Sequence, residues 1–167
     1  MIRTFLVFLA FIIWQPSVLA GQEQDPKEHF TRGEFRGSLF WDNISAMELG
    51  ILKFGGSAGI HVLNGIEVGY QQQFIVPTAD MTQIQSWGYV RLVPFRDWVV
   101  NPFLATRVGH YFLPEKDAPA VGAGCGAVFF VDRHLAFEAS VFAQIVLHPA
   151  KSAERQTEFN WGLVLFF

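Results

Sequence analysis

The sequence predicts an all-β protein: an eight-stranded antiparallel up-and-down transmembrane β-barrel, preceded by a cleavable signal peptide. Three observations predict this class. The 167 residues are 51% hydrophobic and 16% aromatic, yet after residue 20 no apolar run reaches the roughly 18 to 20 residues that a spanning helix needs. Eight segments instead alternate between apolar and polar residues, as strands do. The last segment ends on Phe167 with one apolar and one polar face, which is typical of a strand that faces lipid on one side.

The first twenty residues have the pattern of a secretory signal peptide. Arg3 supplies a positive charge, residues 4–14 are apolar, and small residues precede Gly21. We expect the mature chain to start at Gly21. The expected divisions are a signal peptide at residues 1–20, a polar N-terminal segment at residues 21–32 and an outer-membrane barrel at residues 33–167.

Charge and cysteine content narrow the functional classes. Without Arg3 the chain carries 11 Lys and Arg against 15 Asp and Glu, a net charge of −4. No basic patch for nucleic acid follows from this composition. Cys125 is the only cysteine, so no intramolecular disulfide can form, and burial and hydrogen bonding must stabilise the fold.

The first four strands are expected from their alternation and from the turns between them. They are residues 33–41, 51–63, 66–74 and 82–93. In the second, Phe54 and Ile60 lie on the face opposite Lys53 and His61. In the third, the apolar face opposes Glu67, Gly69, Gln71 and Gln73, and Asn64-Gly65 supplies the type I′ hairpin turn before it. The fourth is the least regular, because Arg91 could extend from either face to the membrane surface.

The last four strands are expected at residues 99–112, 119–131, 134–147 and 157–167. Arg107 determines which residues of the fifth strand face inward, because an arginine facing lipid at mid-strand would be unfavourable by roughly 2 to 4 kcal/mol. The sixth carries Gly122, Gly124 and Gly126 on one face, and the seventh alternates around Glu138. In the eighth, Glu158 and Asn160 share the inner face.

The connections between these strands have 9, 2, 7, 5, 6, 2 and 9 residues, so the odd-numbered connections are longer throughout. Short turns on one side and longer loops on the other are typical of outer-membrane barrels. An even strand number then places both termini on the periplasmic side. Repeated glycine on the polar face favours a narrow, filled interior over a face exposed to water.

The polar face predicts an interior network of charged residues that must pair with one another, because an unpaired buried charge is unfavourable by several kcal/mol. We interpret this network as the filling of a closed barrel, although a narrow pore for small solutes stays open as an alternative. The expected interior polar network is Glu34, Arg36, Lys53, Glu67, Arg107, Glu138 and Glu158.

No catalytic, cofactor-binding or metal-binding residues are assigned. The five histidines lack metal-ligand spacing, and Cys125 is expected to face lipid. Residues 99–167, with Asn101-Pro102-Phe103 at their start, resemble the outer-membrane lipid A deacylase family, which implies an acyl hydrolase as an alternative function. That family carries a histidine two residues before a serine on the seventh strand, where this chain has Ser140, Phe142 and Gln144.

The tail resembles the C-terminal assembly signal of bacterial outer-membrane barrels, carried here by Asn160, Gly162, Leu165 and Phe167. The whole mature chain resembles the small outer-membrane β-barrel family, which includes OmpX-like proteins and the OmpA transmembrane domain. The resemblance implies a monomer in the bacterial outer membrane that contacts outer-membrane lipid and lipopolysaccharide and is inserted by the barrel assembly machinery through its C-terminal strand. Its implied role is structural, or interactive through short external loops, with no enzymatic activity, cofactor or nucleic acid.

Overall fold

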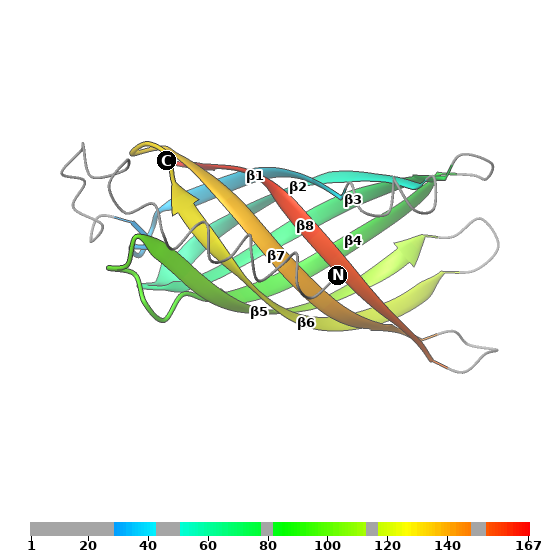
Figure 1. The fold of residues 1–167 in the computed structure, drawn as a ribbon. Helices are drawn as coiled ribbons and strands as arrows, with labels where there is room; N and C mark the ends of the chain where they lie inside the picture. The colour runs from blue at the N-terminus through cyan, green and yellow to red at the C-terminus, as the bar shows by residue number, and fades with distance from the viewer. Residues whose placement is uncertain (1–28, 43–50, 78–81, 113–116, 148–152) are drawn as a thin grey trace, which may run out of the picture.

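The computed structural model describes residues 29–42, 51–77, 82–112, 117–147 and 153–167. They form eight antiparallel strands, each hydrogen-bonded to the next along the chain (Figure 1). The first strand also pairs with the last, so the sheet closes into a barrel. The predicted fold class is confirmed. The strands are β1 Phe35–Asp42, β2 Ile51–Leu63, β3 Ile66–Pro77, β4 Gln83–Leu92, β5 Val100–Phe112, β6 Ala118–Phe130, β7 Leu135–Val146 and β8 Glu154–Phe166.

None of the described residues forms a helix with the length and apolarity needed to cross a membrane. The expected signal peptide at residues 1–20 lies outside the described part of the chain, and so do residues 21–28.

Six strands lie within two residues of their expected bounds, whereas β3 and β8 are each three residues longer at one end. β3 continues to Pro77, and β8 already starts at Glu154, opposite Val146 of β7. In β3 the apolar Ile75 faces inward and is only 8% exposed. The residue after Glu154, Arg155, is polar and exposed. The apolar alternation therefore stops before the backbone pairing does.

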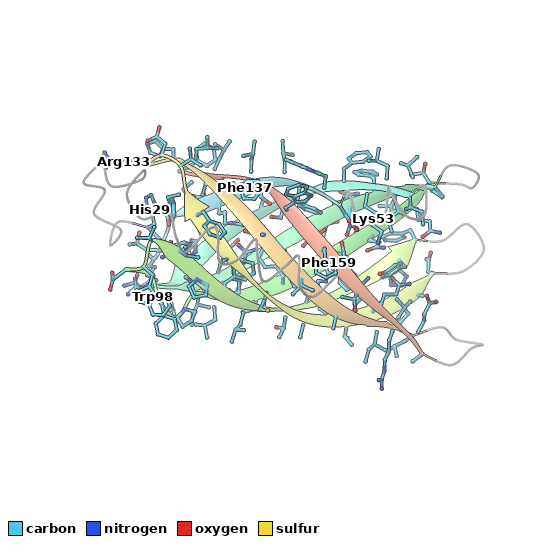
Figure 2. The ribbon with its side chains drawn as sticks, viewed as in Figure 1. His29, Lys53, Trp98, Arg133, Phe137 and Phe159 are labelled. Carbon is cyan, nitrogen blue, oxygen red and sulfur yellow. The ribbon has the colours of Figure 1, made fainter. Side chains whose placement is uncertain are left out.

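The barrel has two different ends. The terminal end carries residues 29–34, Phe167 and the connections 64–65, 93–99 and 131–134, and the opposite end, here called the loop end, is where β1, β3, β5 and β7 end. Figure 2 shows His29, Trp98 and Arg133 at the terminal end and Lys53 toward the loop end.

The expectation that every odd-numbered connection is longer than every even-numbered one is wrong for residues 93–99, which outnumber residues 78–82 and 113–117. The side-chain amide of Asn101 lies 2.9 to 3.2 Å from the carbonyl oxygens of Phe95, Arg96 and Trp98. The rings of Phe95 and Trp98 stack 4.4 Å apart. These contacts fold the long connection back on itself at the terminal end.

The two faces of the wall differ as the alternation predicts. Phe137 of β7 and Phe159 of β8 point outward (Figure 2), and Leu39, Val108 and Leu163 are 69%, 65% and 45% exposed. Side chains of the opposite face are enclosed by the barrel. The largest of these enclosed side chains are Trp87, Arg36 and Arg107, and the carboxylates of Glu67 and Glu158 are enclosed as well; each of the five residues is at most 2% exposed.

Glycines on the inner face make room for large side chains from neighbouring strands. A Cβ on Gly69 would collide with the ring of Tyr89, and a Cβ on Gly109 would lie 2.6 Å from the ring of Trp87. Neither aromatic residue would fit over a bulkier neighbour. The interior glycines thus leave the space that the interior aromatic rings occupy.

The barrel was expected to start at residue 33, yet residues 29 and 30 are already packed against it. Phe30 is 1% exposed and its ring lies 5.5 to 5.7 Å from the rings of His61, Phe130 and Phe166. The amide of Gly65 donates a hydrogen bond to the carbonyl oxygen of Phe30 at 2.8 Å. The polar composition of residues 21–32 hid this apolar anchor.

Candidate functional site

The interior holds two separate groups of charged side chains, which together decide whether the barrel can pass solutes. The first, here called the first charge cluster, consists of Arg36 of β1, Glu67 of β3, Arg91 and Tyr89 of β4, and Glu138 of β7. Each strand contributes these side chains because their positions fall on the inner face.

Arginines and carboxylates in the first charge cluster balance one another. Arg91 donates two hydrogen bonds to Glu138, at 2.9 and 3.0 Å, in a bidentate pair. Arg36 donates to Oε2 of Glu138, which also accepts from Arg91, and lies 3.3 Å from Glu67. The hydroxyl of Tyr89 donates to Glu67 at 2.5 Å. Two positive and two negative charges are thereby paired in a region shielded from water, where unpaired charge is strongly disfavoured.

The second charge cluster lies nearer the loop end and is built around Arg107 of β5 and Glu158 of β8, whose nearest atoms are 2.5 Å apart. Gln73 donates to the other oxygen of Glu158 at 2.5 Å, and Arg107 also donates to Gln144 at 2.6 Å. Gln144 in turn donates to the hydroxyl of Tyr111 at 2.5 Å. Amide side chains therefore give Glu158 a second donor and Arg107 a second acceptor, whereas Nε and Nη1 of Arg107 have no hydrogen-bond partner.

Two aromatic rings contact the Arg107 guanidinium. Its central carbon lies 4.3 Å from the ring of Trp87 and 4.2 Å from the ring of Phe142. Such contacts stabilise a cation most where water is excluded. They also fill the cross-section of the barrel at this level, because Trp87 and Phe142 are 0% and 5% exposed.

The space between the clusters is small. A cavity of about 20 Å³ is lined by Arg91 and Glu138 of the first charge cluster and by neutral polar residues, among them Ser38, Ser57, Gln71, Ser140 and Asn160. This volume is close to the minimum that holds one water molecule. An eight-stranded barrel is expected to leave little more than this, since side chains fill its interior.

Apolar residues close the terminal end. Phe30, Phe103, Phe166 and Val128 are each at most 1% exposed and belong to one packed cluster. The carboxylate of Glu34 holds the segment in place, because it accepts a hydrogen bond from the amide of Phe30 at 2.6 Å. The interior is therefore shut at this end by packing and in its middle by paired charges.

Not all the expected interior residues belong to the two clusters. Glu34 lies at the terminal end, 3.4 Å from Nδ1 of His29 and 3.8 Å from Nδ1 of His61. Lys53 lies toward the loop end, 3.9 Å from Asp42. The structure brings Arg36, Glu67 and Glu138 together, and Arg107 and Glu158 together. Asn160 and Gly162 of the expected assembly signal face inward on β8, whereas Leu165 and Phe167 are exposed on its outer face.

Sequence reasoning missed Arg91, which is 5% exposed and contacts both carboxylates of the first charge cluster. Its inward position could have been inferred from Trp87 and Tyr89, which precede it at intervals of two residues. Large aromatic residues also occur on lipid faces, and the alternate positions of this strand hold the small residues Ser86 and Gly88. Small residues on the outer wall thus reversed the usual pattern.

The hydrolase alternative has no assembled site among the described residues. Ser140 lies inside the barrel beside the cavity between the clusters. On the outer wall Ser86 lies opposite His110, and Nε2 of His110 is 3.7 Å from Asp117. A nucleophilic serine needs a hydrogen bond to its base, and none joins Ser86 to His110 in this structure. The described residues contain no group of three or more His, Cys, Asp or Glu that could hold a metal ion, and His148 and Ser152 lie outside them.

The fold and interior define a class: closed eight-stranded barrels with an apolar outer wall and a filled polar interior. Solved β-barrel structures are similar to the chain in fold. The N-terminal β-barrel domain of Pseudomonas aeruginosa OprF matches with a TM-score of 0.61 and 12% identity, over 81% of this chain and 98% of that one. The P. aeruginosa outer-membrane protein OprG matches with a TM-score of 0.52 and 11% identity, over 82% and 97% of the two chains.

A barrel from a study of de novo designed transmembrane β-barrels also matches, with a TM-score of 0.51 and 13% identity, over 82% of this chain and 98% of that one. No protein-family model matches the chain, and no curated protein matches it in sequence. At these identities the likeness is one of fold. The chain has the fold of small outer-membrane β-barrels, as the resemblance in its sequence implied.

Proposed function

We propose that this chain is an integral outer-membrane protein with a closed interior, whose role is structural or is exerted through its short external loops. The observation that carries the proposal is the combination of an apolar outer wall with an interior filled by two paired charge clusters. A soluble barrel would not expose Leu39, Val108 and Leu163 together. The fold shared with OprF and OprG supports a membrane location.

The proposed orientation places the terminal end in the periplasm and the loop end outside the cell. The proposed assembly signal, Asn160, Gly162, Leu165 and Phe167, would then be read by the barrel assembly machinery from the periplasmic side. The external loops would comprise residues 43–50, 78–82, 113–117 and 147–153. The outer wall would contact outer-membrane lipid and lipopolysaccharide, and we expect a monomer.

Two measurements test the membrane assignment. The full-length protein, expressed with its signal, should be recovered in the outer-membrane fraction. On SDS gels it should migrate differently before and after boiling, because a closed barrel resists SDS until it is heated. Recovery in the soluble periplasm, or unchanged migration on boiling, would contradict the proposal.

The loop role predicts a separation between folding and phenotype. Replacing Glu115 and Lys116 in one loop, or Lys151 in another, should change a cell-surface phenotype such as detergent sensitivity or surface binding. The heat-modifiable migration of the same variants should stay unchanged. Loop variants indistinguishable from wild type in every surface assay would favour a purely structural role.

A narrow pore is the weaker alternative, because the space between the charge clusters is about 20 Å³. We expect silent planar bilayers after insertion of the purified protein, and reproducible single-channel steps would overturn the closed-interior assignment. Hydrolysis is tested separately by mass spectrometry of lipid A from overexpressing cells. If lipid A loses an acyl chain in cells that overexpress the wild type but keeps it in cells that overexpress Ser86→Ala, the protein is an enzyme.

A further inference from the structure

A row of polar side chains crosses the outer wall of the barrel on three neighbouring strands. Gln72 of β3 lies opposite Ser86 of β4, and Ser86 lies opposite His110 of β5. The residues on either side of each along the chain are directed into the barrel, so these three side chains face outward. Gln72, Ser86 and His110 are here called the polar row.

Apolar rows flank the polar row on both sides. Toward the loop end Phe74, Ile84 and Phe112 lie opposite one another, and toward the terminal end Tyr70, Gly88 and Val108 do so. The polar row therefore lies within the apolar belt and not at its edge. Among the described residues, the side chains of Gln72 and Ser86 have no hydrogen-bond partner. Polar groups in a hydrocarbon environment are disfavoured unless a partner satisfies them.

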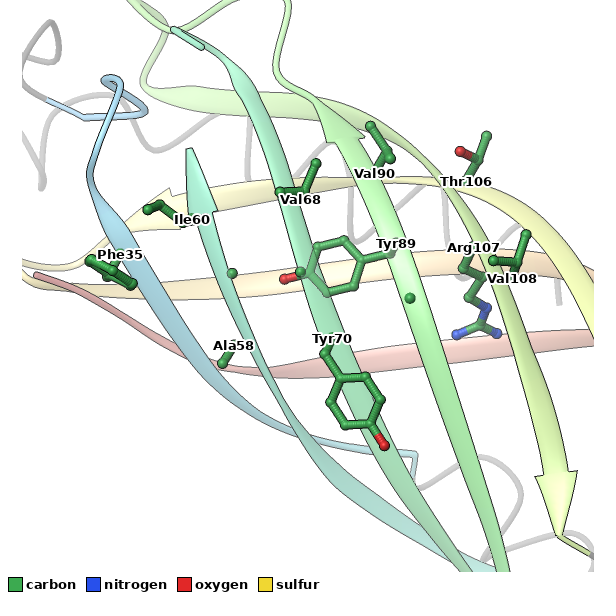
Figure 3. Close-up of a pocket in the computed structure, with 13 residues that line it drawn as sticks. Phe35, Ala58, Ile60, Val68, Tyr70, Tyr89, Val90, Thr106, Arg107 and Val108 are labelled. Carbon is green, nitrogen blue, oxygen red and sulfur yellow. The ribbon is translucent and has the colours of Figure 1, made fainter. Parts of the chain in front are cut away.

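A hollow of about 650 Å³ adjoins the polar row on the side of the terminal end. It lies over Ala58 of β2 and Gly88 of β4, where the wall lacks large side chains, with the exposed side chain of Tyr70 between them and other larger side chains around it (Figure 3). These larger residues are Phe35, Ile60, Val68, Tyr70, Val90 and Val108. The volume lies within the range of small-molecule sites and far exceeds one water molecule, whose share of liquid volume is about 30 Å³.

We propose that the hollow and the polar row form a binding site for an acylated glycolipid of the lipid A type. One acyl chain lies in the hollow, and the ester or amide carbonyl that attaches it accepts hydrogen bonds from the Ser86 hydroxyl and the Gln72 amide. This inference rests on the proposed function, because only with the loop end outside the cell does the polar row lie on the headgroup side for an outer-leaflet lipid.

The geometry favours a lipid over a second copy of the barrel. A chain with a polar linkage at one end matches an apolar hollow that ends in a polar row, so one molecule satisfies both parts. A second barrel would present a convex wall to a concave surface. His110 lies closest to the loop end, 3.7 Å from Asp117, where the headgroup of the bound lipid would begin.

Native mass spectrometry of the detergent-purified protein tests the site. Protein is titrated with purified lipid A or, in parallel, with diacyl phosphatidylethanolamine, and the fraction that carries one lipid is measured. Gly88→Leu fills the hollow, since a Cβ there lies 3.9 Å from its nearest neighbour, the carbonyl oxygen of Val108. Gln72→Leu combined with Ser86→Ala removes the donors. Ala143→Leu, on the outer face of β7, is the matched control.

Wild type and Ala143→Leu should bind lipid A in preference to phosphatidylethanolamine. The variant Gln72→Leu/Ser86→Ala should bind lipid A about tenfold more weakly, as expected for the loss of two ordinary hydrogen bonds. Gly88→Leu should also weaken the binding of lipid A, because its side chain takes the place of the acyl chain in the hollow. Equal binding of both lipids by wild type, equal effects of Gly88→Leu and Ala143→Leu, or a dimer that Gly88→Leu abolishes would overturn the inference. Heat-modifiable migration of every variant reports separately on the membrane barrel.

Discussion

At the scale of single residues, charge balance governs what the interior tolerates. Glu138 contacts both arginines of the first charge cluster, Arg36 and Arg91. Its removal would leave two guanidinium groups with only Glu67. Breaking a buried pair in this way is more harmful than replacing both partners, because one charge stays behind without compensation.

Glu138→Gln should therefore lower the free energy of unfolding by about 3 kcal/mol or more, measured by urea titration in detergent micelles. The double variant Arg91→Met/Glu138→Met should be more stable than Glu138→Gln, since Arg36 and Glu67 remain a balanced pair. Arg155→Gln removes a charge from an exposed position of β8, and it should change stability by less than about 0.5 kcal/mol. A double variant as unstable as the single one would refute this account of the cluster.

Replacing Phe30 should destabilise the terminal end of the barrel and leave the rest of the barrel intact. Phe30→Ala removes a buried ring that contacts His61, Phe130 and Phe166, and such a truncation is unfavourable by about 3 to 5 kcal/mol if the structure stays intact. Release of residues 29–34 avoids that penalty. The amides of Gly33 and Gly65, which donate to His61 and Phe30, should then exchange hydrogen faster.

Amide exchange followed by NMR in micelles checks this expectation, with the amides in the middle of β5 as the internal reference. Phe95→Ala, which truncates an exposed ring at the same end, is the control and should leave Gly33 and Gly65 protected. Uniform acceleration in β5 as well would mean that Phe30 supports the whole barrel.

Residue-scale prediction from sequence succeeded where one side chain had only one tolerable face. Arg107, in mid-strand, could only face inward, and it is 1% exposed. Arg91 lies near a strand end, where both faces offered an acceptable environment, so its place in the first charge cluster did not follow from the sequence. The partners of a buried charge depend on which strands lie opposite across the interior, and the sequence of one strand does not predict which strands those are.

At the scale of elements, the pairing of β1 with β8 is the shortest in the barrel. This seam runs only from Arg36 opposite Phe166 to Trp41 opposite Trp161. Gly162 lies within it, and a Cβ there would be 2.7 Å from Cα of Phe40. Real Cβ atoms do not approach backbone so closely, so the two strands would have to separate.

Gly162→Ala should weaken the seam and lower the temperature at which the band of the folded barrel disappears from SDS gels. Gly37→Ala provides a control in the same seam, because a Cβ there would meet only a ring atom of Phe167 at 4.0 Å. Equal shifts for the two variants would show that the loss of glycine itself, and not the close approach of the backbones, causes the effect.

Element boundaries followed from the sequence only as far as the apolar alternation continued. β2 was located to the residue, because Asn64-Gly65 fixes its end and its faces differ clearly. β8 starts at Glu154, before the alternation begins, since backbone hydrogen bonds to β7 need no apolar side chain. The length of the connection at 93–99 depends on the Asn101 amide, a tertiary contact that strand patterns do not predict.

At the scale of the whole molecule, assembly and stability should separate at Phe167. Its backbone is hydrogen-bonded to Phe35 at 3.0 and 3.1 Å, whereas its side chain is 74% exposed. Deleting Phe167 should therefore reduce the yield of barrel in the outer membrane more than it reduces the stability of protein refolded in detergent. Comparable losses in both would assign the residue to the barrel alone and not to a sorting signal.

The architecture itself was the part of the molecule most open to sequence reasoning, because strand number and alternation together leave few other closed folds. The arrangement of polar residues on the outer wall could not be predicted from the sequence. Gln72 and Ser86 each interrupt an otherwise apolar face, and only the strand register places them side by side with His110. A property shared by three strands becomes visible once their pairing is known.

The seam between β1 and β8 also has a kinetic consequence. It joins residues about 125 positions apart along the chain, whereas every other pairing is a hairpin between consecutive strands. Closing so large a loop is entropically the least favourable step and gains the fewest backbone hydrogen bonds in return. The hairpins can form as a curved open sheet, and the barrel then closes last. Until that moment two unpaired strand edges are available for pairing with another chain.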